Sequence, residues 1–274
     1  MNFFAQLDAA VNKNDSLLCI GLDPDPTLMP TGVDVLAFNK AIIDATADIV
    51  CAYKPNLAFY EAEGQQGWNI LKQTIDYIPN NIPVIADAKR SDIGNTSKAY
   101  AKAIFENLGA GAVTVSPYLG FDSLEPFLKN YPDRGIFVLC RTSNQGAADF
   151  QNLSVKIDDV TMSLYRAVAY KAEQWNTHNN IGLVVGATYP AEMQKLRKAH
   201  PSLPFLVPGL GAQGGDLKLT MGSGQNTDGR GIIINSSRQI LYASRAADFA
   251  LAAAKAAEAL RQEINLHRHH TLVY

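Results

Sequence analysis

A cluster of three charged residues comes directly after a short apolar run. Asp87, Lys89 and Asp92 lie within six residues, immediately behind the segment IPVIA. Lys54 and Asn56, also two residues apart, follow another apolar run. Residues two apart in a strand project from the same face, and charges that face a protein interior require partners. We therefore expect two lysines and several aspartates to meet at one site, where a held ammonium group could stabilise negative charge and transfer a proton.

Each of these residues also has an ordinary structural explanation. Asp23 could cap a turn before Pro24, and Lys54 could reach solvent from the end of a strand. Asp92 could be the N-cap of the helix that follows it, with Thr96 four residues on along the same helix face. The cluster of three charges is harder to explain in this way than any single residue.

A second region has the composition of a phosphate site. Residues 209–231, GLGAQGGDLKLTMGSGQNTDGRG, are dense in glycine and longer than an ordinary connection. Glycine allows backbone N–H groups to approach an anion closely, and the guanidinium of Arg238 can grip a phosphate through two parallel hydrogen bonds. Gln213 and Arg238, with Ser237 beside it, are thus a candidate phosphate clamp, although a plain surface loop would also fit the glycine content.

The elements that must position these residues alternate between apolar runs and amphipathic segments. No Asn-Gly or Asp-Gly turn joins two runs, which argues against an antiparallel meander. Apolar runs separated by helices predict a parallel sheet buried on both faces, and eight of them favour a closed (β/α)8 TIM barrel, with a short N-terminal helix and a long Gly-rich loop after strand seven. The expected strands are Leu17–Leu22, Ala52–Leu57, Val84–Ala88, Ala112–Ser116, Ile136–Cys140, Ile181–Gly186, Phe205–Val207 and Gly231–Asn235. The expected helices include Val35–Ile49, Ser97–Leu108, Val160–Trp175, Ala191–Lys198 and Ala246–Ile264.

Composition limits the classes of protein that remain. The 274 residues are 47% hydrophobic and 18% charged with a net charge of −2, which excludes a disordered chain and gives no basic surplus for nucleic acid. Three cysteines without a C-x-x-C pair argue against disulfides or zinc and suit the cytoplasm. No segment is apolar enough to span a membrane. We expect residues 1–274 to form a single cytoplasmic domain without a metal site, the histidines at 267, 269 and 270 being a terminal tail.

The motifs together resemble a known family. Residues 87–96, DAKRSDIGNT, match the D-x-K-x-x-D-I-x-x-T signature of orotidine 5′-phosphate decarboxylases. The signature core alone is shared with sugar-phosphate lyases of the same superfamily, but further matches run in the family's order from residue 21 to 238 and resemble its longer branch. These further matches are Gly21-Leu-Asp23, Lys54-Pro-Asn56-Leu-Ala-Phe-Tyr-Glu61, Arg141-Thr142-Ser143-Asn144, Pro208-Gly-Leu-Gly-Ala-Gln213-Gly-Gly and Asn235-Ser-Ser-Arg238.

The resemblance implies decarboxylation of orotidine 5′-phosphate to uridine 5′-phosphate and CO2, in pyrimidine nucleotide synthesis, without cofactor or metal. Lys89 would protonate C6 of the pyrimidine within a Lys54–Asp87–Lys89–Asp92 charge chain, and Asp87 would face the departing carboxylate. The active unit would be a homodimer, because the residues matching Asp92 and Thr96 reach the neighbouring subunit's site in this family. The resemblance also assigns substrate contacts: Asp23, Lys54 and Asn56 to the ribose, Thr142 and Ser143 to the base, and Gln213 and Arg238 to the phosphate.

Three other functions remain open at this stage. A Mg²⁺-dependent sugar-phosphate lyase of the same superfamily would use the charges at the strand ends as metal ligands and lose activity in a chelator. A Schiff-base enzyme would need a neutral Lys89, whereas neighbouring carboxylates favour the charged ammonium. A non-catalytic nucleotide-phosphate binder would bind uridine 5′-phosphate without releasing CO2. The sequence leaves open the conformation of residues 214–229 and the roles of Ser116, Arg141 and Thr188.

Overall fold

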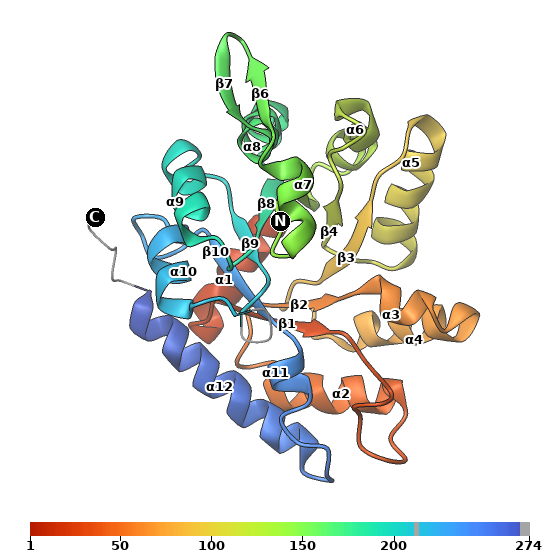
Figure 1. The fold of residues 1–274 in the computed structure, drawn as a ribbon. Helices are drawn as coiled ribbons and strands as arrows, with labels where there is room; N and C mark the ends of the chain where they lie inside the picture. Colours follow the sequence, from red (N-terminus) through yellow and green to blue (C-terminus); the bar gives the residue numbers. More distant parts are fainter. Residues whose placement is uncertain (211–213, 269–274) are drawn as a thin grey trace.

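The chain folds into a barrel of parallel strands surrounded by helices (Figure 1). The computed structural model describes residues 1–210 and 214–268. The strand order around the sheet is β2-β1-β10-β9-β8-β5-β4-β3. Two isolated bridges, Tyr53 with Val84 and Asn56 with Asp87, join β2 to β3 and bring the two edges together. The predicted (β/α)8 barrel is confirmed.

All eight expected strands are present, with ends that differ from the prediction by at most two residues. Most of their residues are fully buried, as expected for parallel strands covered by helices. The barrel strands are β1 (Leu18–Leu22), β2 (Ala52–Pro55), β3 (Ile85–Arg90), β4 (Ala112–Val115), β5 (Gly135–Arg141), β8 (Ile181–Val185), β9 (Phe205–Val207) and β10 (Ile232–Ser236).

The helices lie outside the barrel, apart from short ones that shape its rim (Figure 1). The longer helices are α1 (Phe3–Asn14), α2 (Val35–Thr46), α4 (Gly64–Tyr77), α5 (Gly94–Lys102), α6 (Phe121–Asn130), α8 (Leu164–Trp175), α9 (Pro190–Ala199), α10 (Leu217–Gly224) and α12 (Phe249–His267). The short ones are α3 (Leu57–Glu61), a π-helical turn (Ala103–Asn107), a 3-10 turn (Gln145–Ala147), α7 (Ala148–Gln151) and α11 (Arg238–Leu241).

The predicted N-terminal helix is α1, and it packs against the starts of β4 and β5. Phe3 is buried, donates its backbone N–H to the carbonyl of Asp133 at 2.8 Å, and meets the ring of Phe137 edge-on. A Cβ at Gly135 would lie 2.4 Å from the Phe3 ring, so glycine is required for this close approach. Helix α1 thus covers the amino ends of these strands and leaves their carboxyl ends available for a site.

One expected helix was wrong at its start. We predicted a helix over Val160–Trp175, but residues Val160–Ser163 form strand β7, which pairs antiparallel with β6 (Ser154–Ile157), and helix α8 begins only at Leu164. The hairpin turn consists of Asp158 and Asp159, both at positive φ (47° and 66°), as in the two-residue turns that usually contain glycine. This hairpin projects beyond the barrel (Figure 1).

The Gly-rich segment after β9 is also more ordered than a simple loop. Helix α10 occupies Leu217–Gly224 within it, and the Asp216 carboxylate caps the helix by accepting from the Leu219 N–H at 2.8 Å. The buried Arg197 guanidinium donates to the carbonyl at the other end of α10, Gly224, at 2.8 Å. Gln213 lies outside the described residues. Among the helices that the structure describes, we found none with the length and hydropathy needed to cross a membrane.

Candidate active site

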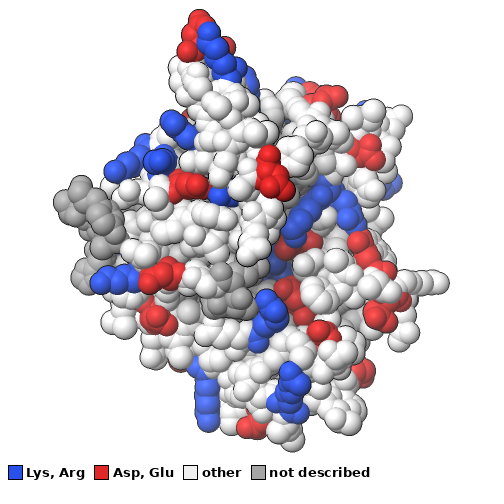
Figure 2. All heavy atoms as spheres, in the orientation of Figure 1, with Lys and Arg blue, Asp and Glu red and all other residues white. Residues whose placement is uncertain are grey.

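A cavity of about 480 Å³ opens at the carboxyl ends of the barrel strands. This is the end of a (β/α)8 barrel where active sites are built. Lys and Arg side chains lie beside Asp and Glu side chains around the hollow on this face (Figure 2). Nine of the predicted site residues line the cavity: Asp23, Lys54, Asn56, Asp87, Lys89, Thr142, Ser143, Ser237 and Arg238.

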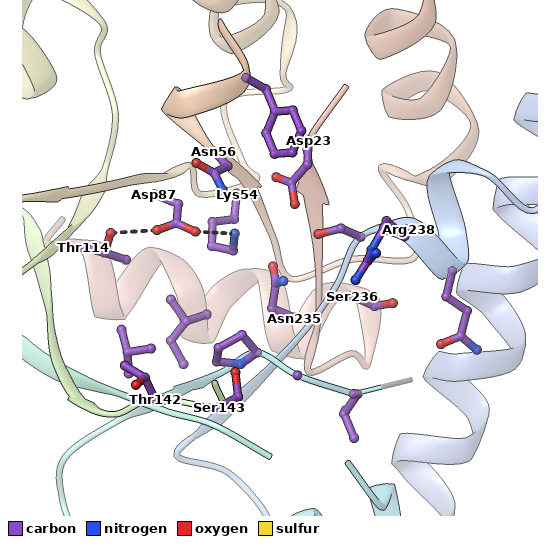
Figure 3. A pocket seen from close by; sticks show the side chains of 18 of the residues that line it. Asp23, Lys54, Asn56, Asp87, Thr114, Thr142, Ser143, Asn235, Ser236 and Arg238 are labelled. Carbon is purple, nitrogen blue, oxygen red and sulfur yellow. Dashed lines mark hydrogen bonds and ion pairs between the residues drawn. The ribbon is translucent and has the colours of Figure 1, made fainter. Parts of the chain in front are cut away.

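The centre of the site is a chain of three charges. The Lys54 ammonium lies 2.9 Å from Oδ2 of Asp87, and the Lys89 ammonium lies 2.7 Å from Oδ1 of the same carboxylate. Thr114, on β4, donates its hydroxyl to Asp87 Oδ1 at 2.9 Å, so both carboxylate oxygens are engaged (Figure 3). Lys54 is almost completely buried, whereas the Lys89 side chain is half exposed. Of the two lysines, Lys89 is therefore the one that faces the cavity opening.

Lys89 has an unusual backbone conformation. Its φ is +48°, in the left-handed region that non-glycine residues rarely adopt. The pairing of β3 with β4 shifts register between Ala86 and Arg90, and the Lys89 N–H donates to the Thr114 hydroxyl at 3.0 Å. Asp87 and Lys89 do meet, as predicted from their spacing, but through an irregular strand end rather than simple alternation.

Asp87 and Lys54 keep each other ionised despite their burial. Burial favours a neutral carboxyl at Asp87, but the Lys54 and Lys89 ammonium groups outweigh it and hold the pKa of Asp87 well below its usual range. Burial likewise favours a neutral amine at Lys54, yet the carboxylates of Asp87 and Asp23 raise its pKa above the ordinary lysine value. The site therefore contains a fixed carboxylate between two cations near neutral pH.

Asp92 and Thr96 are placed differently from the other predicted residues. Within the described part of the chain, neither lines the cavity and Asp92 forms no ion pair. The Asp92 carboxylate accepts from the N–H of Ile93 at 2.7 Å, and the N-cap of α5 is Ile93, so the alternative explanation of Asp92 as the helix N-cap does not hold. Of the four residues in the predicted charge chain, three are thus in contact within one copy of the protein: Lys54, Asp87 and Lys89.

The cavity extends from the charged triad to Arg238 on the opposite side, with Asp23 and Asn235 between them (Figure 3). Arg238 is exposed at the start of α11 and, in the region described, has no carboxylate partner. A Cβ at Gly21 would lie 1.9 Å from Ser237 Oγ. Glycine at position 21 therefore allows the loop that carries Ser237 and Arg238 to pack against β1.

Several polar atoms between these two ends are available to a ligand. Asp23 Oδ1 is buried and has no hydrogen-bond partner among the described residues. Asn56 uses its carbonyl to cap α3, accepting from the Ala58 N–H at 3.3 Å, which leaves its amide N–H groups for other contacts. These groups suit a polyhydroxylated ligand.

Sequence reasoning gave no role of their own to several polar residues of this cavity, Thr114 and Asn235 among them. Thr114 lines it and holds Asp87, and Asn235 lines it with a buried Oδ1 that lacks a partner within the described chain. The signals were present: Thr114 is a hydroxyl flanked by valines inside a buried strand, and Asn235 directly follows three isoleucines. Each is a polar residue in an apolar run, a position that requires a partner.

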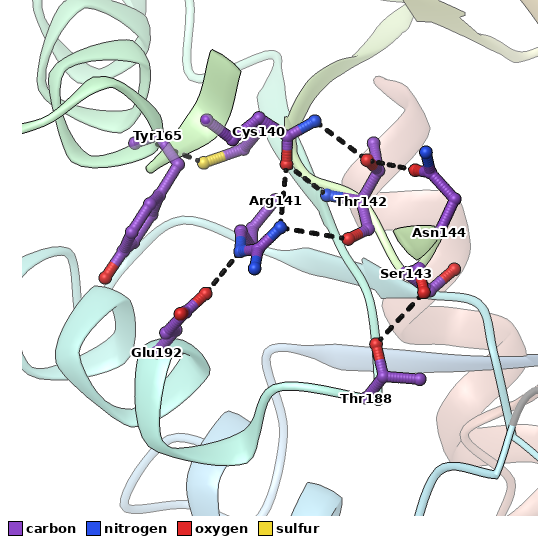
Figure 4. A network of polar contacts seen from close by, with 9 residues as sticks. Cys140, Arg141, Thr142, Ser143, Asn144, Tyr165, Thr188 and Glu192 are labelled. Atoms are coloured by element: carbon purple, nitrogen blue, oxygen red, sulfur yellow. Dashed lines mark hydrogen bonds and ion pairs between the residues drawn. The ribbon is translucent and has the colours of Figure 1, made fainter. Parts of the chain in front are cut away.

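The three residues whose roles the sequence left open lie outside the cavity lining. The Ser116 N–H donates to the Arg90 carbonyl at 3.0 Å. Thr188 donates its hydroxyl to the Ser143 carbonyl at 3.3 Å, linking two neighbouring strand ends. Arg141 is fully buried and pairs with Glu192 on α9 (Figure 4).

Comparison with known proteins identifies the family. The model of the "Orotidine 5'-phosphate decarboxylase / HUMPS family" matches residues 16–254. The chain belongs to the orotidine 5′-phosphate decarboxylase family. It is 58% identical over 268 residues to the orotidine 5′-phosphate decarboxylase of Dehalococcoides mccartyi strain CBDB1, covering 98% of this chain and 99% of that protein. It is 51% identical over 278 residues to that of Cupriavidus metallidurans, covering 98% and 100%.

Solved structures of the decarboxylase family share the fold. OMP decarboxylase of Leishmania donovani superposes with a TM-score of 0.86 at 44% identity, covering 98% of this chain and all of that one. UMP synthase of the same organism superposes with a TM-score of 0.88 at 46% identity, covering 98% of this chain and 57% of that one. The resemblance recognised from the sequence motifs is confirmed.

The low pKa of Asp87 leads to a pH-dependent prediction for the variant Asp87→Asn. This substitution leaves the buried Lys54 without a counter-ion, which should lower the free energy of unfolding by about 3–5 kcal/mol near neutral pH. Because the folded-state pKa lies below the usual one, the carboxylate contributes fully above about pH 4 and loses its contribution as the pH falls further. Urea unfolding of both proteins from pH 7 to pH 3 measures this, and a difference that does not shrink in acid would contradict it.

Proposed function

We propose that this protein decarboxylates orotidine 5′-phosphate to uridine 5′-phosphate and CO2 with its own side chains alone. The observation that carries the proposal is the Lys54–Asp87–Lys89 triad in a cavity whose far side presents Arg238. Membership of the decarboxylase family supports it independently. The reaction needs a cation at the carbon that loses CO2 and a second cation for the phosphate, and the cavity offers both.

The chemical step is a C–C cleavage followed by a proton transfer. The bond between C6 and the carboxylate breaks, CO2 leaves, and the electron pair stays at C6 in the plane of the ring. The Lys89 ammonium stabilises this developing charge and then gives its proton to C6. Lys89 becomes a neutral amine and regains a proton from solvent, which its half-exposed side chain can reach.

Asp87 contributes by being charged beside the substrate carboxylate. Two like charges about 4 Å apart repel by roughly 4 kcal/mol at an effective dielectric of about 20, and loss of neutral CO2 relieves this repulsion. Lys54 keeps Asp87 ionised, and Thr114 orients it. Most of the rate enhancement in this proposal comes from the fixed placement of these charges.

The remaining residues hold the parts of the nucleotide that do not react. Asp23, Lys54 and Asn56 would bind the ribose hydroxyls, and Thr142 and Ser143 would lie against the base. Gln213, Ser237 and Arg238 would bind the phosphate. Since the phosphate is remote from C6, its binding energy can be used to organise the triad around the substrate.

The partners that Asp87 already has argue against the three alternative functions, a metal-dependent lyase, a Schiff-base enzyme and a simple binder. Both of its oxygens are engaged by ammonium and hydroxyl groups, so a Mg²⁺ ion would have to displace cations to bind there. Among the described residues no group of three or more His, Cys, Asp or Glu side chains could hold a metal ion. A Schiff base requires a neutral Lys89, which the adjacent carboxylate opposes. A simple binder would not need an ionised triad.

The first prediction of this proposal concerns turnover. The absorbance of orotidine 5′-phosphate should fall rapidly with purified protein in excess EDTA, and Lys89→Ala should remove nearly all turnover because the proton donor is gone. The variant should still bind uridine 5′-phosphate, and the exposed Lys255→Ala on α12 is the matched control. Loss of activity in EDTA, or a tenth of wild-type activity in Lys89→Ala, would contradict the mechanism.

The second prediction concerns the phosphate. Arg238→Ala removes a charged hydrogen bond to the substrate and should reduce kcat/KM by roughly 10- to 100-fold. Steady-state kinetics measures the change, with Arg245→Ala, an exposed arginine seven residues on, as the control. Unchanged kcat/KM in Arg238→Ala would rule out this residue as part of the phosphate clamp.

We further propose that two copies of the chain form the active unit. Asp92 and Thr96 lie outside their own chain's cavity, on a part of the surface that also exposes Ile93 and Tyr100. The loop before the neighbouring α6 exposes Tyr118 and Leu119. A second copy packed here would bury these side chains and bring its own Asp92 to the triad.

Mixing two inactive variants tests the shared site. In a twofold dimer of Lys89→Ala with Asp92→Ala, one site carries both substitutions and the other carries neither. Equal mixing and re-association should therefore restore about a quarter of wild-type activity, because half the dimers are mixed and half their sites are intact. Activity equal to the mean of the two separate variants would contradict the proposal that Asp92 acts across the interface.

A further inference from the structure

Arg141 is a buried cation that the proposed reaction does not use. It has 1% of its surface exposed, yet its Nε donates to Glu192 and its guanidinium stacks 3.7 Å from the centre of the Tyr189 ring. The register of β5 against β8 shifts between Leu139 and Arg141. Because of this irregularity Arg141 points toward α9 instead of into the cavity that Leu139 lines. Removing one partner of such a buried ion pair is strongly destabilising.

Gln151, at the end of α7, connects Arg141 to Thr142 in the cavity wall. Its Oε1 accepts from the Arg141 guanidinium at 3.2 Å and from the Thr142 N–H at 2.9 Å. Its Nε2 donates to the Thr142 hydroxyl at 2.8 Å. One amide thus fixes both the backbone and the side chain of Thr142, and the two donors on Oε1 determine which way the amide is oriented.

The hydroxyl of Thr142 is held on two sides and keeps one lone pair free to accept a further hydrogen bond. It accepts from Gln151 and donates to Asn144 Oδ1 at 2.7 Å. The neighbouring Ser143 carbonyl accepts from Thr188. Residues 142–144 line the cavity. Contacts from residues outside the cavity lining hold Thr142 and Ser143 in position. Because these residues are already ordered before a ligand binds, less conformational entropy is lost on binding.

We propose that Gln151 is a positioning residue for the pyrimidine base, held in its orientation by the buried Arg141–Glu192 pair. It acts through Thr142 and Ser143 and touches no reacting atom. This inference rests on the proposed function, because segment 142–144 lies against the base only if the ligand is a pyrimidine nucleotide. It predicts a loss of affinity confined to the base end of the ligand.

The test compares a ligand that has the base with one that lacks it. Gln151→Met keeps the length of the side chain and removes its hydrogen bonds. Calorimetric titration should show the dissociation constant for uridine 5′-phosphate rising about tenfold, as expected for lost hydrogen bonds, with that for ribose 5-phosphate changing less than twofold. Gln151→Glu retains the acceptor toward Arg141 and Thr142 and should lose less. Gln145 is an exposed glutamine in the 3-10 turn that precedes α7. The variant Gln145→Ala should bind both ligands as the wild type does.

Equal losses for both ligands in Gln151→Met, or an unchanged affinity for uridine 5′-phosphate, would overturn the inference. Glu192→Gln provides a second route, since it weakens the support of Arg141 and should produce the same base-specific loss to a smaller extent. A wild-type protein that binds uridine 5′-phosphate but does not decarboxylate orotidine 5′-phosphate would overturn the proposed function and leave this inference testable. A wild type that binds uridine 5′-phosphate no better than ribose 5-phosphate would overturn both.

Discussion

The Asp87 carboxylate between two ammonium groups is the interaction on which the site depends. Burying Lys54 or Asp87 alone would be costly, and each is tolerated only because the other is within hydrogen-bonding distance. The triad, together with the Thr114 hydroxyl that contacts Asp87, therefore requires β2, β3 and β4 to meet at one end of the barrel. Lys54, Asp87 and Thr114 come from these three strands. The bridge between Asn56 and Asp87 lies at this same point of closure.

Two supporting arrangements extend from this centre. On one side, glycine at position 21 permits Ser237 to pack against β1 and so places Arg238 across the cavity from the triad. On the other, the irregular end of β5 sends Arg141 outward to α9, where it anchors Gln151 and the segment that lines the cavity wall. At Arg141 a departure from regular strand geometry aims a side chain that regular alternation would have misplaced. The left-handed Lys89 is a second example.

The position of Asp92, half-buried and outside the cavity of its own chain, gives the proposed dimer its physical reason. Among the described residues of one chain, Lys89 pairs with the carboxylate of Asp87 alone, and in the proposed dimer the second copy would supply another. Activity would then depend on assembly. The exposed apolar side chains near Asp92 offer the surface that such an association would bury.

The sequence was sufficient to predict the barrel, the eight strands and nine residues of the cavity, because apolar periodicity and polar residues at strand ends are local signals. It did not reveal the β6–β7 hairpin, since Asp158 and Asp159 adopt positive φ without glycine, nor helix α10 within the Gly-rich segment. Thr114 was missed because it is a single polar residue in an apolar strand, and Asn235 appeared only as part of a motif, with no role of its own. The direction of Arg141 toward α9 and the hold of Gln151 on Thr142 became visible only in the folded chain. Those contacts depend on a shift in strand register and on helix packing, which no local pattern in the sequence encodes.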